Sequence, residues 1–284
     1  MRRLRERIQN LNSAYFLLTK IIHKIRLLFI LAFIVVLHPP LLHAQGKAGV
    51  GGTAFEIMDG VFQQLQYAEG YQSLQLTITT KDGRAVVYKV SLYQKHHASF
   101  FVFNSMTRGT VLKLLYNNQG QNIYAYMTHD KRLFHKKYLD RFENILGSGF
   151  AYLDIGNGSF VDNYQQKING VEKNANGEFT VIENLPLEKG NYGKLVVLVD
   201  PKKQNRLERI DYYDSAMTLM KTMTFKYGSL PIKETKTSTK QVEYPVRWEM
   251  ADMSRGTVST LEFFSIDKTA RLDDSLFKKE NLEK

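Results

Sequence analysis

Residues 71–93 read YQSLQLTITTKDGRAVVYKVSLY, and this stretch decides the fold. Apolar residues occupy every second position, first at Leu74, Leu76 and Ile78 and again across 86–92. A period of two places them on one face of a β-strand, with Gln and Thr on the other face. The intervening 81–83, Lys-Asp-Gly, is a turn signal, because Gly tolerates left-handed backbone and Asp bonds to nearby amides. The stretch predicts an antiparallel hairpin with one apolar and one wet face.

The same pattern of short strands and turns continues to Ile266. Turn signals fall at 117–120, 174–177 and 200–203. About eight strands make a barrel that side chains can fill, so a longer series leaves room for a ligand or needs a plug. We therefore expect a curved, mainly β (α+β) domain, apolar inside and wet outside. Its thirteen strands are predicted at 72–80, 84–93, 98–104, 109–117, 121–127, 131–137, 163–172, 177–184, 192–200, 206–213, 217–227, 243–251 and 256–266.

One amphipathic helix precedes the strands. Thr53 and Glu56 are spaced as a capping box, and apolar residues follow at helical spacing from Ala54 to Leu65. That apolar stripe must pack on the sheet, where the helix would act as a stopper or lid. A second covering element is expected in the long insertion 138–163, which combines a helical piece with a glycine-rich stretch, because long loops in a regular meander are often functional. The segment 232–240 is Lys- and Thr-rich and is expected to be a solvated edge or loop.

The N-terminal residues 1–44 have the order of a signal peptide. A basic stretch ends at Arg26, eleven apolar residues run from Leu27 to Leu37, and Ala44 stands at a suitable cleavage position. Eleven helical residues span about 16 Å, roughly half a bilayer core, so cleavage is favoured over a retained anchor. The expected mature chain is a single domain, 45–284, exported to the periplasm. No cysteine is present, which excludes both cysteine lipidation and a disulfide framework.

Charge and motifs argue against several functions. The whole chain carries a formal net charge of +11, but 45–284 keeps 32 basic and 27 acidic residues, a net charge of +5. With no basic helix and no aromatic-plus-basic signature, we expect no nucleic-acid binding. His96 and His97 are adjacent, and neighbouring residues of a strand point to opposite faces, so they cannot bind one metal ion together. His129 and His135 lack companion ligands. We therefore expect no metal and no other cofactor. Ser148 lacks the full Gly-x-Ser-x-Gly motif, so no catalytic residue is predicted and the protein is not expected to be an enzyme.

Some aromatic and basic residues allow more than one interpretation. The run 100–103, Phe-Phe-Val-Phe, is apolar on both faces and indicates a strand covered on both sides. Trp248 either lines the interior or lies at its rim with its N–H in water. Arg84, Arg108 and Arg247 are candidate cations for a lid carbonyl or a lipid phosphate, although solvation at the surface is the default for each.

Three blocks, taken in order, resemble the outer membrane lipoprotein-sorting protein family of LolA-like carriers. They are 109–114 (GTVLKL), 123–126 (IYAY) and 146–154 (LGSGFAYLD), and later pieces around Tyr212, Lys221 and 245–252 agree in order. The resemblance covers 53–277 and implies an open, unclosed antiparallel β-barrel, with an N-terminal helix and a short helical loop covering the concave face. The family usually has Asp where this chain has Gly149, whereas Asp154 matches its second acidic position.

The resemblance implies a periplasmic carrier. Such a carrier binds acyl chains of a lipoprotein or envelope lipid in a hydrophobic half-barrel and passes them from an inner-membrane RND- or ABC-type transporter towards the outer membrane. The alternative is a non-carrier sensor or accessory subunit of such a transporter with the same fold. A monomer is favoured. The predicted lipid-binding residues are Ile57, Val61, Leu76, Ile78, Tyr88, Val90, Leu112, Leu114, Phe150, Tyr152, Val197, Tyr212, Met223, Phe225, Trp248, Met250 and Phe263.

Overall fold

The computed structural model describes residues 52–118, 120–156, 160–188 and 190–284. The expected signal segment 1–44 lies outside these residues. Within them, no helix combines the length and the apolar character needed to cross a bilayer. The helices are α2 (Ala54–Leu65) and the short α3 (Phe160–Asn163), with 3₁₀ turns at Tyr138–Phe142, Ile145–Gly147, Pro201–Lys203, Asp274–Phe277 and Lys279–Asn281.

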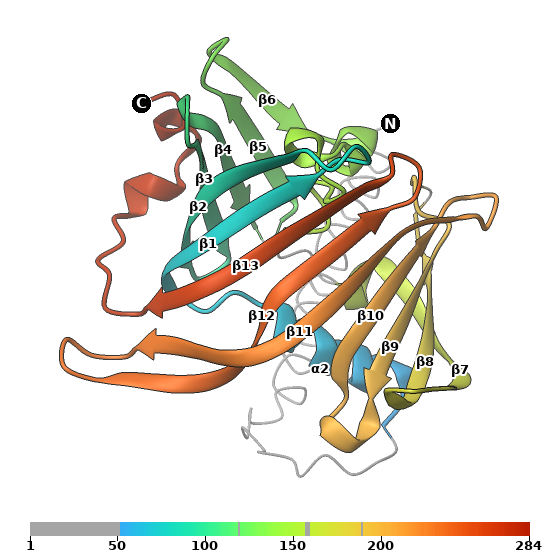
Figure 1. Cartoon of the computed structure of the whole chain (residues 1–284). Coiled ribbons are helices and arrows are strands. Elements are labelled where there is room, and N and C mark those ends of the chain that lie inside the picture. The colour runs from blue at the N-terminus through green and yellow to red at the C-terminus, as the bar shows by residue number, and fades with distance from the viewer. Residues whose placement is uncertain (1–51, 119, 157–159, 189) are drawn as a thin grey trace, which may run out of the picture. The chain divides into compact units, whose positions relative to one another are not determined.

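Among the described residues, thirteen strands form one sheet (Figure 1). Their order across the sheet is β6-β5-β4-β3-β2-β1-β13-β12-β11-β10-β9-β8-β7, and neighbours in this order are antiparallel. The sheet does not close, so β6 and β7 are its two edges. The bounds are β1 Gly70–Thr79, β2 Ala85–Lys95, β3 Ala98–Ser105, β4 Gly109–Asn117, β5 Asn122–Met127, β6 Arg132–Lys136, β7 Tyr164–Asn174, β8 Gly177–Pro186, β9 Lys194–Asp200, β10 Arg206–Tyr213, β11 Leu219–Lys233, β12 Thr239–Asp252 and β13 Thr257–Asp267.

The predicted open antiparallel half-barrel is therefore confirmed, with one error in the strands. The strands β11 and β12 are longer than the predicted 217–227 and 243–251, because β11 runs on to Lys233 and β12 begins at Thr239. Leu230 and Ile232 of the extended β11 are buried, at 1% and 6% exposure, whereas residues 234–240 are exposed, as expected for a solvated segment. β12 pairs with β13 only from Arg247 to Asp252. Next to the part of β12 that precedes Arg247, Ile232 of β11 instead pairs directly with Ile266 of β13.

The curl of the sheet follows from alternation and from bulges. Along β1 every second residue is buried, which directs Leu74, Leu76 and Ile78 to the concave face. Register shifts interrupt the ladders, for example at Ser73/Leu74 and at Lys226/Gly228. A bulge bends its strand and increases the local twist, so repeated bulges curl a wide sheet.

Helix α2 lies on the concave face (Figure 1). Its capping box is formed, since Thr53 Oγ1 accepts from the Glu56 amide at 3.3 Å and Glu56 Oε2 accepts from the Thr53 amide at 2.7 Å. The helix buries the stripe Ile57, Met58, Val61, Phe62 and Leu65 in the main core. At about 1.5–3 kcal/mol for each fully buried side chain, this stripe holds the helix on the sheet.

A smaller apolar cluster lies on the opposite face of the sheet. Phe100, Leu115 and Tyr126 point away from the main core, and Leu282 of the C-terminal segment covers them with 1% exposure. Phe101 and Phe103 of the same strand belong to the main core. The expectation that 100–103 is covered on both sides is confirmed.

We predict that Leu282→Ala lowers the free energy of unfolding by about 2 kcal/mol, because it leaves a cavity under the C-terminal segment. Leu187→Ala, at a side chain that is 64% exposed, is the matched control and should change little. Urea unfolding of both variants measures the difference. Equal effects at the two positions would show that the C-terminal segment adds no stability.

Candidate functional site

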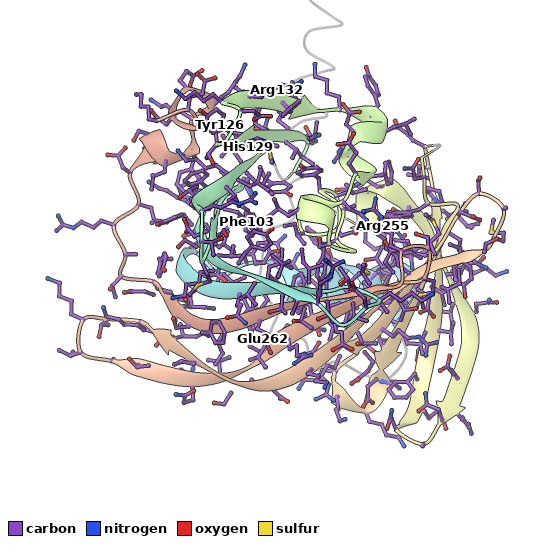
Figure 2. All side chains as sticks on the ribbon, turned by 45° about the horizontal axis from the view of Figure 1, so that its top comes forward. Phe103, Tyr126, His129, Arg132, Arg255 and Glu262 are labelled. Carbon is purple, nitrogen blue, oxygen red and sulfur yellow. The ribbon has the colours of Figure 1, made fainter. Side chains whose placement is uncertain are left out.

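The concave face is covered by elements that do not belong to the sheet. One is α2, and the other is residues 143–156, here named the cover segment. Ile145, Phe150, Tyr152 and Ile155 of this segment are each 6% exposed or less and join the main apolar cluster. Side chains fill the inside of the curled sheet, where Phe103 lies (Figure 2).

The cover segment is a compact loop with its own hydrogen bonds. The Ile145 amide donates to the Phe150 carbonyl at 2.8 Å, and the Tyr152 amide donates to the Glu143 carbonyl at 3.1 Å. The chain reverses through Leu146 (φ 51°) and Gly147 (φ 80°). Glycine adopts this left-handed backbone at position 147 without steric cost. Several backbone groups of the loop are therefore hydrogen-bonded within the loop itself.

A buried ion pair joins the cover segment to the sheet. Lys221 Nζ of β11 lies 2.6 Å from Asp154 Oδ2, and the two side chains are 5% and 2% exposed. The same ammonium donates to the Gly149 carbonyl at 3.1 Å. Asp154 also accepts from the Ala151 amide at 2.7 Å and from the Tyr192 hydroxyl at 2.9 Å. Such additional bonds are what allow two charges to be buried together.

Buried tyrosines add to this attachment. Tyr67 and Tyr116 donate their hydroxyls to the carbonyls of Ile155 (3.0 Å) and Tyr152 (2.9 Å). Burial raises the pKa of both phenols well above the ordinary value. Burial, with Asp154 nearby, does the same for the pKa of Tyr192. These groups therefore remain neutral donors at any physiological pH.

The structure accounts for the glycine at position 149. A Cβ there would lie 2.7 Å from Met250 Cγ and 3.3 Å from Asp252 Cβ. The Gly149 amide donates to Ser259 Oγ at 3.1 Å. The loop is pressed so closely onto β12 and β13 that the family's usual Asp does not fit without a shift.

The predicted lipid-binding residues are brought together on the concave face. Sixteen of the seventeen belong to the main buried cluster, and Tyr88 packs against it while partly exposed. Trp248 is 2% exposed, and its N–H donates to the Pro245 carbonyl at 3.0 Å, so the alternative with a wet rim is wrong. The interior that the sequence predicts as a cavity is filled here by α2 and the cover segment. Binding of lipid by these residues stays a prediction.

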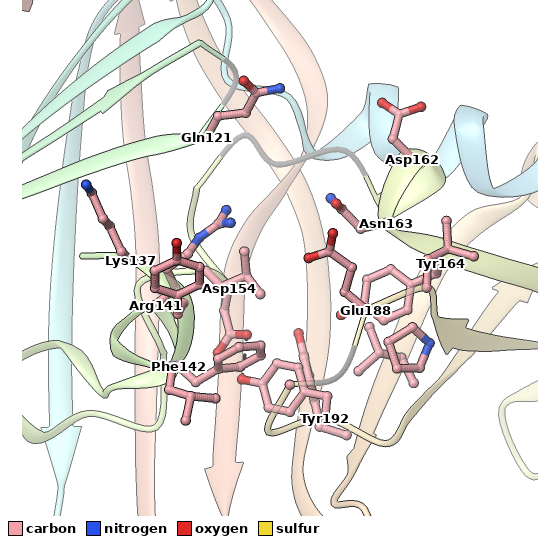
Figure 3. A pocket seen from close by; sticks show the side chains of 18 of the residues that line it. Gln121, Lys137, Arg141, Phe142, Asp154, Asp162, Asn163, Tyr164, Glu188 and Tyr192 are labelled. Atoms are coloured by element: carbon pink, nitrogen blue, oxygen red, sulfur yellow. Dashed lines mark hydrogen bonds between the residues drawn. The ribbon is translucent and has the colours of Figure 1, made fainter. Parts of the chain in front are cut away.

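A cleft of about 710 Å³ opens beside the cover segment (Figure 3). It lies between segments from the two ends of the sheet, and of the predicted set only Tyr212 lines it. Sequence reasoning missed most of its walls, including Arg141, Phe142, Tyr164 and Tyr192. The signal that could have found part of it was the unusual length of the insertion 138–163.

The other candidate groups have structural partners. Ser148 is fully buried and bonds within its own loop, accepting from the Phe150 amide at 3.2 Å. His135 stacks on Tyr124 with ring centroids 4.4 Å apart, and burial followed by the charges of Lys137 and Lys279 lowers its pKa. In the part of the chain that the structure describes, no three His, Cys, Asp or Glu side chains are grouped to hold a metal ion.

Known structures share this architecture. A DUF1329 family protein from Desulfovibrio piger superposes with a TM-score of 0.67 at 18% identity, covering 81% of this chain and 97% of that one. A putative outer membrane lipoprotein-sorting protein domain from Vibrio parahaemolyticus gives 0.65 at 18% identity, with 81% and 98% covered. A LolA superfamily protein from Nitrosomonas europaea gives 0.63 at 18% identity, with 82% and 100% covered. The fold is thus that of the LolA-like open half-barrels.

A family model described as "-like: Uncharacterized protein" matches residues 94–284, about two thirds of the chain. The chain belongs to that family. No curated protein matches it in sequence.

We predict that Lys221→Met lowers the free energy of unfolding by about 3–5 kcal/mol, because Asp154 is left charged and buried without its partner. The double variant Asp154→Asn/Lys221→Met should recover at least half of that loss. Urea unfolding measures both. Lys173→Met, which breaks the exposed pair with Glu178, is the control and should leave the midpoint unchanged. Equal losses in the single and double variants would mean that the ion pair does not hold the cover segment.

Proposed function

We propose that this protein is a lipid carrier that binds acyl chains on its concave face after α2 and the cover segment move aside. One observation carries this proposal: the apolar face of the sheet is covered by separate elements and not by strand pairing. A sheet closed by hydrogen bonds cannot open without losing them, whereas a packed cover can be displaced by another apolar surface of similar area.

The physical requirement for such a carrier is an apolar lining. Exposing a sixteen-carbon acyl chain to water costs about 12 kcal/mol, at roughly 0.8 kcal/mol per methylene. The residues now packed against α2 and the cover segment would contact the acyl chain instead. The apolar face of the sheet would be covered both in the free protein, by α2 and the cover segment, and in the loaded protein, by the acyl chain.

The cleft at Tyr212 supports a route of entry. Its lining includes Phe142, Leu153 and Leu195, and also Asp154 of the cover segment. A chain that entered there would first contact the part of the cover held by the Asp154–Lys221 pair. Release of the cover would then enlarge the cleft towards the core.

The signal-like N-terminus and the fold together support a place in the periplasm. Because several acyl chains resist transfer into water, a carrier would receive its cargo from an energised inner-membrane transporter of the RND or ABC type. It would then pass the cargo to an acceptor on the outer-membrane side.

The filled interior favours a second candidate function. A LolA-like domain whose core stays closed would act as a sensor or accessory subunit of an envelope transporter, through its surface alone. Purification of the protein from its native envelope separates the two functions. Bound lipid identified by native mass spectrometry supports the carrier, and a stable transporter complex without lipid supports the accessory subunit.

A disulfide across the cover tests the carrier directly. The Cβ built at Gly149 lies 3.6 Å from Met250 Cβ, within the range that a disulfide spans. The natural chain has no cysteine, so Gly149→Cys/Met250→Cys introduces one defined pair. We expect the oxidised form to bind a fluorescent fatty acid at least tenfold more weakly than the wild type, because the cover cannot leave β12.

The reduced form of the same variant is the matched control and should regain affinity close to that of the wild type. Each single cysteine variant should be insensitive to oxidation. Equal affinity in the oxidised and reduced forms would show that acyl chains do not bind beneath the cover segment.

A further inference from the structure

The cleft beside the cover segment carries opposite charges on its two walls. Lys137 and Arg141, from the chain that follows β6, stand on one wall (Figure 3). Asp162 of α3 and Glu188, which follows β8, stand on the other. Asp154 also borders the cleft, but Lys221 neutralises it. The cleft is therefore polarised across its width without a strong net charge.

Arg141 has hydrogen-bonding capacity that the protein does not use. Its Nη2 donates to the Gly120 carbonyl at 3.0 Å, while its Nε is shielded from solvent and has no hydrogen-bond partner among the described residues. No carboxylate of the described residues lies within ion-pair distance of this guanidinium. A buried donor without an acceptor is uncommon. Nε itself is shielded, but the guanidinium lines the cleft with its charge unpaired, so an anionic ligand oxygen would pair with the part of the group that faces the cleft.

The rim of the cleft is apolar and unusually exposed. Tyr138, Leu139 and Leu187 all line it and are 87%, 61% and 64% exposed. Large apolar side chains gathered around charged groups indicate a binding site for an amphipathic partner. A soluble phosphate ester would use the charges but not these side chains, whereas a lipid would use both.

We infer that the cleft binds a zwitterionic phospholipid head group, with its phosphate at Arg141 and Lys137 and its ammonium towards Glu188. The two walls provide the two charges that such a head group needs, and a head group with the phosphate alone would leave the acidic wall facing an anion. This inference rests on the proposed function, since it names the head group of the lipid whose chains the half-barrel would hold.

Isothermal titration with three lipids of identical short chains tests the inference. They are phosphatidylethanolamine, phosphatidylglycerol and diacylglycerol, which carry both charges, the phosphate alone and neither charge. We expect the wild type to bind phosphatidylethanolamine at least tenfold more tightly than diacylglycerol. Arg141→Gln should bring it within threefold of diacylglycerol, whose own affinity stays unchanged and reports an intact fold.

Three further variants sharpen the test. Arg141→Lys should keep part of the preference, because the charge remains. Glu188→Gln should remove the advantage of phosphatidylethanolamine over phosphatidylglycerol. Arg271→Gln, at an exposed arginine of the C-terminal segment that does not line the cleft, is the control and should change neither affinity.

Each contrary result has a defined meaning. Equal binding of all three lipids, or no effect of Arg141→Gln, overturns the head-group inference and leaves the carrier intact. Failure of diacylglycerol and both phospholipids to bind overturns the carrier as well. Competition by phosphoethanolamine without acyl chains, at the affinity of the whole lipid, would assign the cleft to soluble phosphate esters and overturn the lipid assignment.

Discussion

The Asp154–Lys221 pair is the contact on which the closed form depends. It joins a loop to the middle of the sheet across 67 residues of sequence, and it is almost completely buried. Apolar contacts alone would let the cover segment slide over the concave face, since they have little directional preference. A buried ion pair has one geometry in which all its partners are satisfied, so it fixes the position of the loop. The surrounding bonds to Gly149, Ala151 and Tyr192 depend on that position.

The need for such a contact follows from the sheet. Thirteen antiparallel strands that curl without closing produce a broad apolar face and two edges, β6 and β7. In the part of the chain that the structure describes, no further strand covers that face. The chain covers it with α2 before the first strand and with the cover segment between β6 and β7, and it covers part of the other face with its last residues. Each cover comes from outside the series of hairpins, which is why it can be attached by side chains without disturbing the ladders.

The sequence predicts the strands and α2 well, and it predicts the contacts between distant elements poorly. Period-two alternation is local, so the hairpins, α2 and the inward faces of Leu76, Val197 and Phe225 were predictable. The ends of β11 and β12 were not predictable, because the exposed tip of a long hairpin has the composition of a loop, although Leu230 and Ile232 before it face the core. The sequence could not decide whether Trp248 is buried or lies at the rim, because that depends on its N–H having a partner inside the protein, which is the Pro245 carbonyl. The partner of Asp154 and the free donor of Arg141 depend on tertiary contacts, which no periodicity encodes.

The insertion 138–163 links the two parts of the candidate site. Its first residues carry Arg141 and the exposed Tyr138, and the cover segment, which contains Asp154, follows them. The Arg141 carbonyl accepts from the Leu153 amide at 2.9 Å, one residue before Asp154. A head group drawn to Arg141 would therefore act on the backbone that positions the buried ion pair. In that arrangement, recognition at the mouth and release of the cover are properties of one loop. A ligand lacking the charged group would meet a cover still held in place, so the filled interior of the free protein is compatible with selective binding.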